Sequence, residues 1–271
     1  MSIKLIAIDL DGTLLNNNRV ITSAVKKSIL TAKSYGVHIL LATGRPYIGT
    51  QQYLHDLELD KVGCYCICNN GSLIVHAENG KPLFETLLNY SDYVYLESLS
   101  RQVGSHFHVF DHQKLYTANR DISKYTVHES FITGIPLYFC PADEMDQKIS
   151  FSKMMMIDYP SVLDRAITYI PEKTYKLYTI MKSSPYFLEI LSKDADKGKG
   201  IALMANYLNI SRENIMSIGD HENDLAMLKY AGIGVAMGNA EPLIKNAAQF
   251  VTKSNQEDGV MVAINKFLLH Q

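Results

Sequence analysis

The sequence has no strong excess of charge of either sign, and its first apolar run is short. Its 26 lysines and arginines nearly balance its 28 aspartates and glutamates, which gives a formal net charge of -2. This balance gives no electrostatic reason to expect nucleic acid or an anionic membrane as a partner. The apolar run that ends at Asp9 is too short for a secretory signal or for a membrane span, which needs about 20 residues. We therefore expect a cytoplasmic protein.

The sequence has only four cysteines, and they do not suggest a disulfide framework. Cys64, Cys66 and Cys68 alternate within one apolar run, and Cys140 stands alone. Because residues two apart share one face of a strand, the triplet predicts buried or half-buried strand packing. A thiolate metal site is the alternative, but no second group of ligands with zinc-type spacing accompanies the triplet.

Several common motifs are absent as well. Gly232, Gly234 and Gly238 do not have the G-x-G-x-x-G spacing of a dinucleotide-binding loop. The sequence contains neither a G-x-x-x-x-G-K-[ST] loop nor a G-x-S-x-G elbow. These absences disfavour a dinucleotide-binding fold, a P-loop NTPase and a serine hydrolase.

What the sequence does contain is a series of short apolar runs that alternate with helical patterns. A chain of 271 residues, 47% of them hydrophobic, can form one large or two modest domains with a substantial core. Helices are predicted at residues 22–35, 201–208 and 223–230. Together with the strands, they predict an α/β fold with a doubly wound, mostly parallel, Rossmann-like sheet. The predicted buried strands are residues 4–9, 37–43, 65–70, 214–220, 233–237 and 250–252.

The middle of the chain lacks this regular alternation. It contains eleven of the seventeen tyrosines and four of the nine histidines, but no motif that suggests chemistry. We therefore predict that residues 84–191 form a second, α+β domain. This domain would be inserted into a sheet domain formed by residues 1–83 and 192–271.

Four of the predicted strands end in short segments that carry polar residues. In open α/β sheets, ligands bind outside the carboxyl ends of the strands, so residues distant in sequence can meet there. If the four strands are neighbours, their polar ends form one site. These segments are Asp9, Leu10, Asp11, Gly12 and Thr13 at the end of the first strand, Thr43, Gly44 and Arg45 at the end of the second, Asn69, Asn70 and Gly71 at the end of the third, and Gly219 and Asp220 at the end of the later one.

Asp9 and Asp11 are the first candidate catalytic residues. In an extended chain their side chains point the same way, and Gly12 allows a sharp turn after them. One carboxylate can act as a nucleophile or metal ligand, and the other as a general acid or base. A solvated turn is the alternative and would be favoured for an isolated Asp-x-Asp. The buried run before the pair and the later motifs favour the functional interpretation.

A second acidic segment lies near the end of the chain. Asp220 closes a predicted strand, and Asn223 and Asp224 open the helix that follows. With Asp9 and Asp11, this segment brings up to four carboxylates together, and these repel one another unless a cation or protons intervene. Oxygen ligands favour a hard cation, and Mg²⁺ fits best. The alternative is a polar turn with a helix cap, which is more plausible for Asp224 than for Asp220.

Two weaker signals concern phosphate binding. Thr43 and Gly44 place a hydroxyl and an unhindered backbone N–H at a strand end, although such pairs also form ordinary turns. A lysine near the start of the helix at residues 201–208 could neutralise charge on a transferring phosphoryl group. The residues alone do not choose between Lys197 and Lys199, and a solvated basic loop is the alternative.

Taken in order, these motifs resemble those of the haloacid dehalogenase-like phosphatases, and the resemblance covers essentially the whole chain. The inserted middle segment corresponds to the large cap of the Cof-type subfamily. The segments that resemble the superfamily are residues 9–15, 43–46, 197–198 and 219–224. Those that resemble the Cof-type subfamily are residues 69–71 and 251–260, and those that resemble the cap of YidA-type sugar phosphatases are residues 104–108, 115–131 and 185–191.

The resemblance implies a role for each matched residue. Asp9 is the implied nucleophile, which forms an aspartyl-phosphate, and also a ligand of Mg²⁺. Asp11 is the implied general acid and base, and its backbone carbonyl is an implied metal ligand. Asp220 is implied to complete the metal site, with Asp224 supporting it from close by. The implied phosphate-binding groups are Thr43, Gly44, Lys197, Asn223 and the backbone of Leu10.

We therefore expect a Mg²⁺-dependent phosphatase of small phosphate monoesters, above all sugar phosphates, whose inserted domain acts as a cap that sets specificity. A sugar phosphomutase or phosphotransferase could use the same site, and a non-catalytic regulator that binds sugar phosphates could keep the fold. A pure binder needs no nucleophile and acid pair, so Asp9 and Asp11 argue against the regulator. The YidA-type resemblance is also compatible with a homodimer.

Overall fold

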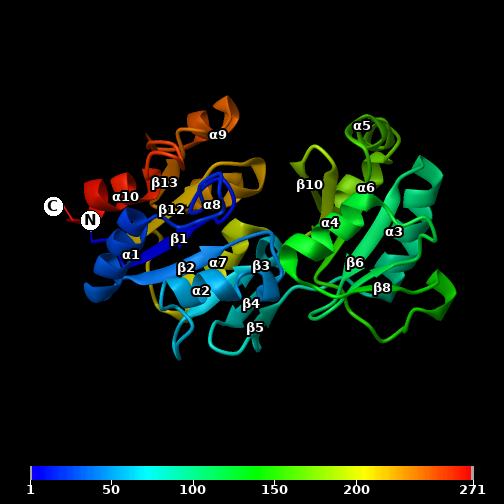
Figure 1. Cartoon of the computed structure of the whole chain (residues 1–271), viewed down its shortest axis with the longest axis horizontal. Helices are drawn as coiled ribbons and strands as arrows, with labels where there is room; N and C mark the ends of the chain where they lie inside the picture. The colour runs from blue at the N-terminus through cyan, green and yellow to red at the C-terminus, as the bar shows by residue number, and fades with distance from the viewer. Residues whose placement is uncertain (1, 270–271) are drawn as a thin grey trace. The chain divides into compact units, whose positions relative to one another are not determined.

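The computed structural model describes residues 2–269, which form two compact units. Unit 1 comprises the described residues up to Gly44, together with Gln51–Phe84 and those from Asp196 onward. Unit 2 comprises Arg45–Thr50 and Glu85–Ala195. Figure 1 shows the elements of each unit, with those of unit 2 coloured mainly green.

Unit 1 is built around an eight-stranded sheet with the strand order β14-β13-β12-β1-β2-β3-β4-β5. The strands from β14 to β3 pair in parallel, whereas β4 pairs with β3 in the antiparallel direction. The parallel strands alternate with helices along the chain, as expected for a doubly wound fold. The strands are β1 (Leu5–Ile8), β2 (His38–Ala42), β3 (Tyr65–Cys68), β4 (Leu73–His76), β5 (Pro82–Glu85), β12 (Ile215–Gly219), β13 (Ile233–Ala236) and β14 (Phe250–Val251).

The helices of unit 1 begin and end where local capping chemistry allows. The Thr22 hydroxyl accepts a hydrogen bond from the backbone N–H of Val25 at the start of α1. Helix α7 begins at Lys197, four residues before the predicted start, because the Asp196 carboxylate caps it by accepting from the N–H of Lys199. The helices are α1 (Ser23–Ser34), α2 (Gln51–Asp56), α7 (Lys197–Tyr207), α8 (Leu225–Tyr230), α9 (Pro242–Ala247) and α10 (Gly259–Ile264), with short 3₁₀ turns at Asn69–Gly71, Arg212–Asn214 and Glu222–Asp224 and a π-helical turn at Asn265–Leu269.

Cysteine packing in unit 1 follows the expectation from sequence. Cys66 and Cys68 lie in β3 and are fully buried, and Cys64 directly precedes the strand. The sulfur atoms of Cys66 and Cys68 are 3.6 Å apart, so the two side chains share one face. Their thiols therefore contribute apolar packing inside unit 1, at the end of β3 that precedes Asn69.

Unit 2 is an α+β unit with the strand order β10-β11-β9-β6-β7-β8. β10 with β11, β11 with β9, β9 with β6 and β6 with β7 pair in the antiparallel direction, whereas β7 pairs with β8 in parallel. The strands are β6 (His106–Phe110), β7 (Leu115–Thr117), β8 (Leu137–Phe139), β9 (Lys153–Ile157), β10 (Tyr178–Ser184) and β11 (Phe187–Ser192). The helices are α3 (Tyr90–Val103), α4 (Lys124–Thr133), α5 (Pro160–Thr168) and α6 (Glu172–Leu177), with 3₁₀ turns at Tyr47–Gly49 and Ala142–Glu144.

The core of unit 2 is aromatic and rich in methionine. Tyr93 of α3 stacks on Phe151 with ring centroids 5.4 Å apart, and Met154 and Met156 of β9 join the same cluster. An Asn89 capping box starts α3. With its inserted α+β unit and its mostly parallel sheet in unit 1, the chain has the fold class predicted from the sequence. The domain limits predicted from the sequence, and the role of unit 2 as a cap, stay predictions.

A short segment, Arg45–Thr50, packs into unit 2 although its neighbours on both sides belong to unit 1. A Cβ atom on Gly49 would lie 3.3 Å from the backbone carbonyl of Thr133 in α4. Burial raises the pKa of Glu129 in α4 of unit 2. The positive charges of Lys153 and of Arg45, which belongs to this segment, oppose that rise. Lys153 is itself buried, with its Nζ 3.6 Å from Glu129 and 3.5 Å from Glu189. We call this segment the hexapeptide.

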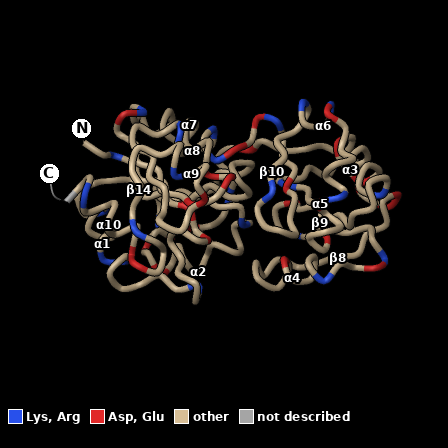
Figure 2. The backbone as a smooth tube through the Cα atoms, turned by 90° about the horizontal axis from the view of Figure 1, so that it is seen from above, with Lys and Arg blue, Asp and Glu red and all other residues tan. Residues whose placement is uncertain are grey.

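Lysines and arginines occur together with aspartates and glutamates along the backbone of each unit, as Figure 2 shows. Within residues 2–269, no helix combines the length and the apolar content that crossing a membrane would require. The longest helix in this part of the chain, α3, has 14 residues and includes Asp92, Glu97 and Arg101. Each unit thus contains charged residues of both signs, in agreement with the balanced charge of the sequence.

Candidate active site

The four strands with polar ends lie side by side in the sheet of unit 1. The strand order places β12, β1, β2 and β3 next to one another, and their pairing is parallel. Ile8, the last residue of β1, lies opposite Ile218 of β12 and Leu41 of β2. The residues that follow these strands therefore begin at one edge of the sheet, as the sequence analysis required.

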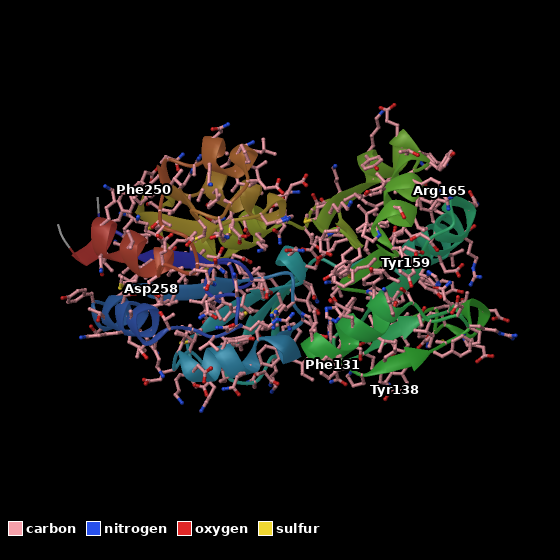
Figure 3. The ribbon with its side chains drawn as sticks, turned by 45° about the horizontal axis from the view of Figure 1, so that its top comes forward. Phe131, Tyr138, Tyr159, Arg165, Phe250 and Asp258 are labelled. Carbon is pink, nitrogen blue, oxygen red and sulfur yellow. The ribbon has the colours of Figure 1, made fainter. Side chains whose placement is uncertain are left out.

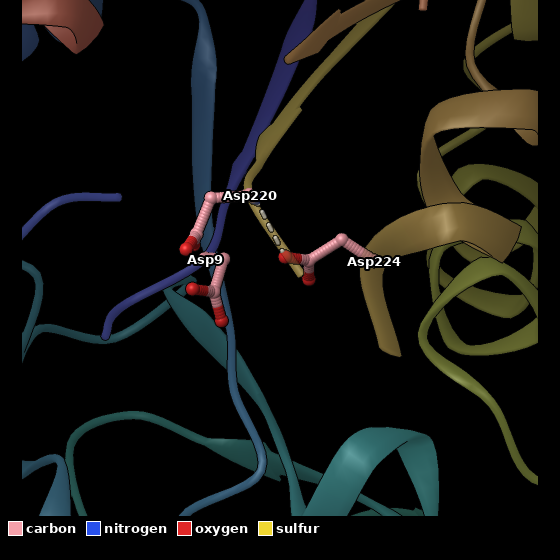
Figure 4. A group of neighbouring side chains, drawn as sticks. All are labelled: Asp9, Asp220 and Asp224. Atoms are coloured by element: carbon pink, nitrogen blue, oxygen red, sulfur yellow. Dashed lines mark hydrogen bonds between the residues drawn. The ribbon is translucent and has the colours of Figure 1, made fainter. Parts of the chain in front are cut away.

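Three carboxylates meet at this edge, as Figure 4 shows. Asp9, Asp220 and Asp224 each have a carboxylate oxygen within 4.8 Å of the others. Asp9 is only 5% exposed and Asp224 is fully buried. The Thr13 hydroxyl donates a hydrogen bond to Asp220 over 2.7 Å, which fixes the third carboxylate. Side chains separated by more than 200 residues in sequence thus form one acidic cluster.

Lys197 lies within the acidic cluster. Its Nζ is 2.5 Å from Oδ1 of Asp9 and 2.7 Å from Oδ1 of Asp224, and the side chain is fully buried. Lys199 differs, because its side chain is 48% exposed and its Nζ lies 3.9 Å from Oδ2 of Asp196, outside the cluster. Of the two candidate lysines, the structure therefore places Lys197 beside the carboxylates.

Asp224 organises the turn that carries Asp220. Its Oδ2 accepts hydrogen bonds from the backbone N–H groups of Asp220, over 2.9 Å, and His221, over 3.1 Å. Its Oδ1 accepts from Lys197. Because both oxygens already accept hydrogen bonds, Asp224 is well placed to orient Asp220 and Lys197 from the side of the cluster.

The electrostatics of the cluster favour a bound cation. Burial and the charge of Asp224 raise the pKa of Asp9, although Lys197 opposes this rise. Burial and Asp224 also raise the pKa of Asp220, to about 6. Burial lowers the pKa of Lys197, but the carboxylates of Asp224 and Asp9 outweigh this effect and raise it overall. One lysine faces three carboxylates, so a divalent cation bound by their oxygens would balance the excess negative charge.

The candidate phosphate-binding residues gather around Asn70. The Asn223 side chain donates a hydrogen bond to Oδ1 of Asn70 over 3.0 Å. The backbone N–H of Asn70 donates to the carbonyl of Thr43 over 2.9 Å, and a Cβ atom on Gly44 would lie 3.1 Å from the Asn70 amide nitrogen. The structure therefore brings Thr43, Gly44 and Asn223 together, with Asn70 between them.

Asn70 was predicted to lie at the end of a strand, but no role was predicted for it. It has a φ of 53°, between Asn69 at 46° and Gly71 at 97°. A positive φ costs energy at the two asparagines but not at Gly71, and such strain concentrates at functional sites. The Asn-Asn-Gly composition was the available signal, because asparagine and glycine tolerate this conformation best.

Further contacts hold the residues that follow Asp9 after β1. Gly12 has a φ of +81°, and a Cβ atom there would lie 2.4 Å from Oδ2 of Asp220, so only glycine fits. Asn239 donates from Nδ2 to the carbonyl of Gly12 over 2.9 Å, a role that no sequence pattern indicated. Leu10 is buried and Asp11 is exposed, and Asp11 forms a short β-bridge with Leu15.

The sequence matches one family of known proteins along almost its whole length. The family model described as haloacid dehalogenase-like hydrolase matches residues 6–264. The chain belongs to the haloacid dehalogenase-like hydrolases. This membership confirms the family predicted from the motifs and the predicted class of enzyme, a phosphoric monoester hydrolase.

Relatives of this haloacid dehalogenase-like hydrolase match it along its whole length. The YxeH protein of Bacillus subtilis is 45% identical over 266 residues, 98% of each chain. YcsE of the same organism, named a 5-amino-6-(5-phospho-D-ribitylamino)uracil phosphatase, is 31% identical and covers 99% of this chain and 97% of its own. A crystal structure of a haloacid dehalogenase-like hydrolase from Bacteroides thetaiotaomicron is 28% identical, with a TM-score of 0.86 over 98% of this chain and 100% of the other.

Proposed function

We propose that this haloacid dehalogenase-like hydrolase is a Mg²⁺-dependent phosphatase that cleaves small phosphate monoesters, above all sugar phosphates, through an aspartyl-phosphate on Asp9. The observation that carries the proposal is the placement of Lys197 between Asp9 and Asp224, with Asp220 in the same acidic cluster. A buried nucleophile beside a fixed cation and a cation-binding group of carboxylates suits phosphoryl transfer, which depends mainly on positioning and charge stabilisation.

In the proposed reaction, an Asp9 oxygen attacks phosphorus while the bond from phosphorus to the alcohol oxygen breaks. Asp11 donates a proton to the departing oxygen and later accepts one from the water that hydrolyses the aspartyl-phosphate. That hydrolysis releases inorganic phosphate and restores Asp9. Mg²⁺, held by Asp9, Asp220 and the backbone carbonyl of Asp11, would supply positive charge to the phosphoryl oxygens.

The remaining residues of the site would hold the phosphoryl group. Lys197 contributes a buried positive charge and fixes the position of the Asp9 carboxylate. Thr43, Gly44 and Asn223 would donate hydrogen bonds to phosphoryl oxygens, with the backbone of Leu10. Asp224 would act through the residues it positions, since its oxygens accept from Lys197 and the turn after β12.

A sugar or sugar-alcohol phosphate is the substrate class that we propose. The name of YcsE describes a phosphate on a ribityl chain, and that relative matches almost the whole chain. Unit 2, with its many tyrosines, is the part that would contact the organic moiety as a cap. A homodimer stays a prediction, and light scattering of the purified protein would test it.

The direct test is phosphate release from a panel of sugar phosphates and the phosphoribityl compound, with Mg²⁺ and with a chelator. We expect release that needs Mg²⁺ and is restored when Mg²⁺ is returned. A phosphodiester serves as a control and should not be cleaved. Isomerised sugar phosphate without free phosphate would favour a mutase instead. Binding of sugar phosphate without any turnover would favour a non-catalytic regulator.

Substitution of Asn70 tests how the phosphate-binding residues are positioned. Asn70→Gly keeps the left-handed backbone but removes the amide that accepts from Asn223, so we expect kcat/KM to fall by about 10- to 100-fold. Asn70→Ala should show the same loss together with about 1–2 kcal/mol of destabilisation, because alanine is strained at a positive φ. Steady-state kinetics and urea unfolding measure the two effects.

Asn209 offers a matched control for this pair of variants. It also has a positive φ, 54°, and it is exposed in the turn after α7, outside the site. Asn209→Ala should therefore lower stability without changing kcat/KM. Wild-type kcat/KM in Asn70→Gly would show that the amide does not position the site.

A further inference from the structure

Unit 2 contains a cavity of about 530 Å³, a size typical of small-molecule sites. All the residues that line it belong to unit 2, whereas the acidic cluster belongs to unit 1. None of these lining residues belongs to the site described above. Its polar lining consists of Arg101, His106, Asn119, Arg120, Asp121 and Asp143. We call it the unit 2 cavity.

Two of the lining side chains are held in place by buried carboxylates. Arg101 donates from Nε and Nη2 to Oε1 of Glu97, both over 2.5 Å, and Glu97 is 8% exposed. Nδ1 of His106 is 2.8 Å from Oδ2 of Asp158, which is 5% exposed. The second Asp158 oxygen accepts from the backbone N–H of Tyr159, which fixes this carboxylate in turn. Such support from behind is what orients binding side chains in preformed sites.

A third lining residue is oriented in the same way. Oδ1 of Asn119 accepts from the backbone N–H of Phe107 over 2.8 Å, and the backbone N–H of Asn119 donates to the Thr117 hydroxyl over 3.2 Å. With its oxygen occupied, Asn119 has its amide N–H groups left as donors. Phe139, a 48% exposed aromatic residue, forms part of the wall. Three supported polar side chains beside an aromatic wall have the construction of a binding site rather than of a solvated surface.

The chemistry of the lining indicates the class of ligand. The N–H groups of Arg101, Asn119 and Arg120 are hydrogen-bond donors suited to an oxyanion, and a guanidinium can bind one in bidentate fashion. Nδ1 of His106 is engaged by Asp158, so its Nε2 is the atom left for a ligand hydroxyl. Two carboxylates of the lining, Asp143 and Asp121, whose Oδ2 lies 3.9 Å from that Nε2, disfavour ligands with several negative charges. We propose that the unit 2 cavity binds a small hydroxylated metabolite with one carboxylate or phosphate group.

The test uses the full-length protein in EDTA, so that the acidic cluster of unit 1 holds no divalent cation that could bind an anion. Glycerate and glycerol 3-phosphate are titrated by calorimetry up to about 10 mM, which detects dissociation constants near 1 mM. We expect at least one of them to bind with a stoichiometry of one. Binding of glycerate alone would assign a carboxylate ligand, and binding of glycerol 3-phosphate alone a phosphate ligand.

Variants locate the binding within the molecule. Arg120→Ala removes an exposed guanidinium, and Asn119→Ala removes the amide donors, so we expect each to weaken binding by about tenfold. Arg165→Ala is the matched control, because Arg165, labelled in Figure 3, is an exposed arginine of α5 in unit 2 and is not among the lining residues. Its affinity should equal that of the wild type. Absence of binding by both probes, or binding that neither cavity variant weakens, would overturn the proposal.

Discussion

Replacement of Asp9 by asparagine should lower kcat for phosphate release by about 10⁴-fold or more, because the amide keeps the shape of the side chain but cannot act as the nucleophile. The measurement is phosphate release with Mg²⁺ from the best ester of the panel. Asp164→Asn is a matched control, since Asp164 is an exposed carboxylate of unit 2 that pairs with Lys182. It should keep wild-type activity.

The same variant should not lose stability in the absence of metal. Burial and the charge of Asp224 raise the pKa of Asp9, so its ionised form destabilises the folded state as the pH rises through that pKa. Asparagine carries no charge and avoids this cost, and we expect thermal unfolding in EDTA at pH 7 to occur at an equal or higher temperature than in wild type. Retained turnover in a folded Asp9→Asn protein would mean that another group is the nucleophile.

Replacement of Lys197 by alanine should impair both activity and stability. It removes the buried positive charge that pairs with Asp9 and Asp224, so we expect kcat to fall by about 10²- to 10³-fold. It also leaves Asp9 and Asp224 buried without their partner, which typically costs about 3–5 kcal/mol of unfolding free energy. Phosphate-release kinetics and urea unfolding measure the two losses.

Two comparisons separate this effect from a general effect of losing a lysine. Lys199→Ala, two residues along the same helix and half exposed, should change neither quantity by a comparable amount. Adding Asp224→Asn to Lys197→Ala removes one of the stranded charges and should recover part of the lost stability. If Lys197→Ala unfolds at the wild-type urea concentration, the buried ion pairs do not stabilise the fold as argued.

Local sequence signals predicted most of unit 1. Buried apolar runs gave the parallel strands because both faces of such strands are covered, and the helix predicted at residues 22–35 is α1, which begins after the Thr22 cap. Helix α7 was predicted to begin too late because Gly198 and Gly200 are poor helix formers and hid the helical pattern of its first turn. Glycine is needed there because neighbouring residues pack closely against this turn. At Gly198, a Cβ atom would lie 2.7 Å from the backbone of Ala226.

Contacts between distant parts of the chain could not be predicted in this way. Nothing near Asn239 in sequence indicates that it donates to the carbonyl of Gly12, and nothing near Asn70 indicates that it accepts from Asn223. The candidate roles of Asp9, Asp220 and Lys197 came from motif order, whereas their contacts became visible only in the fold. The pairing order of the sheet in unit 2 also depends on partners that are far apart in sequence, which apolar periodicity does not encode.

The hexapeptide Arg45–Thr50 has a consequence for how such proteins can exchange parts. Because it belongs to unit 2, the chain passes from one unit to the other four times rather than twice. A hybrid that takes only Glu85–Ala195 from a relative would therefore place a foreign α4 against the original Tyr47–Gly49 turn. Unit 2 is inherited as two separate stretches of sequence, and a transplant that is meant to carry its properties has to move both.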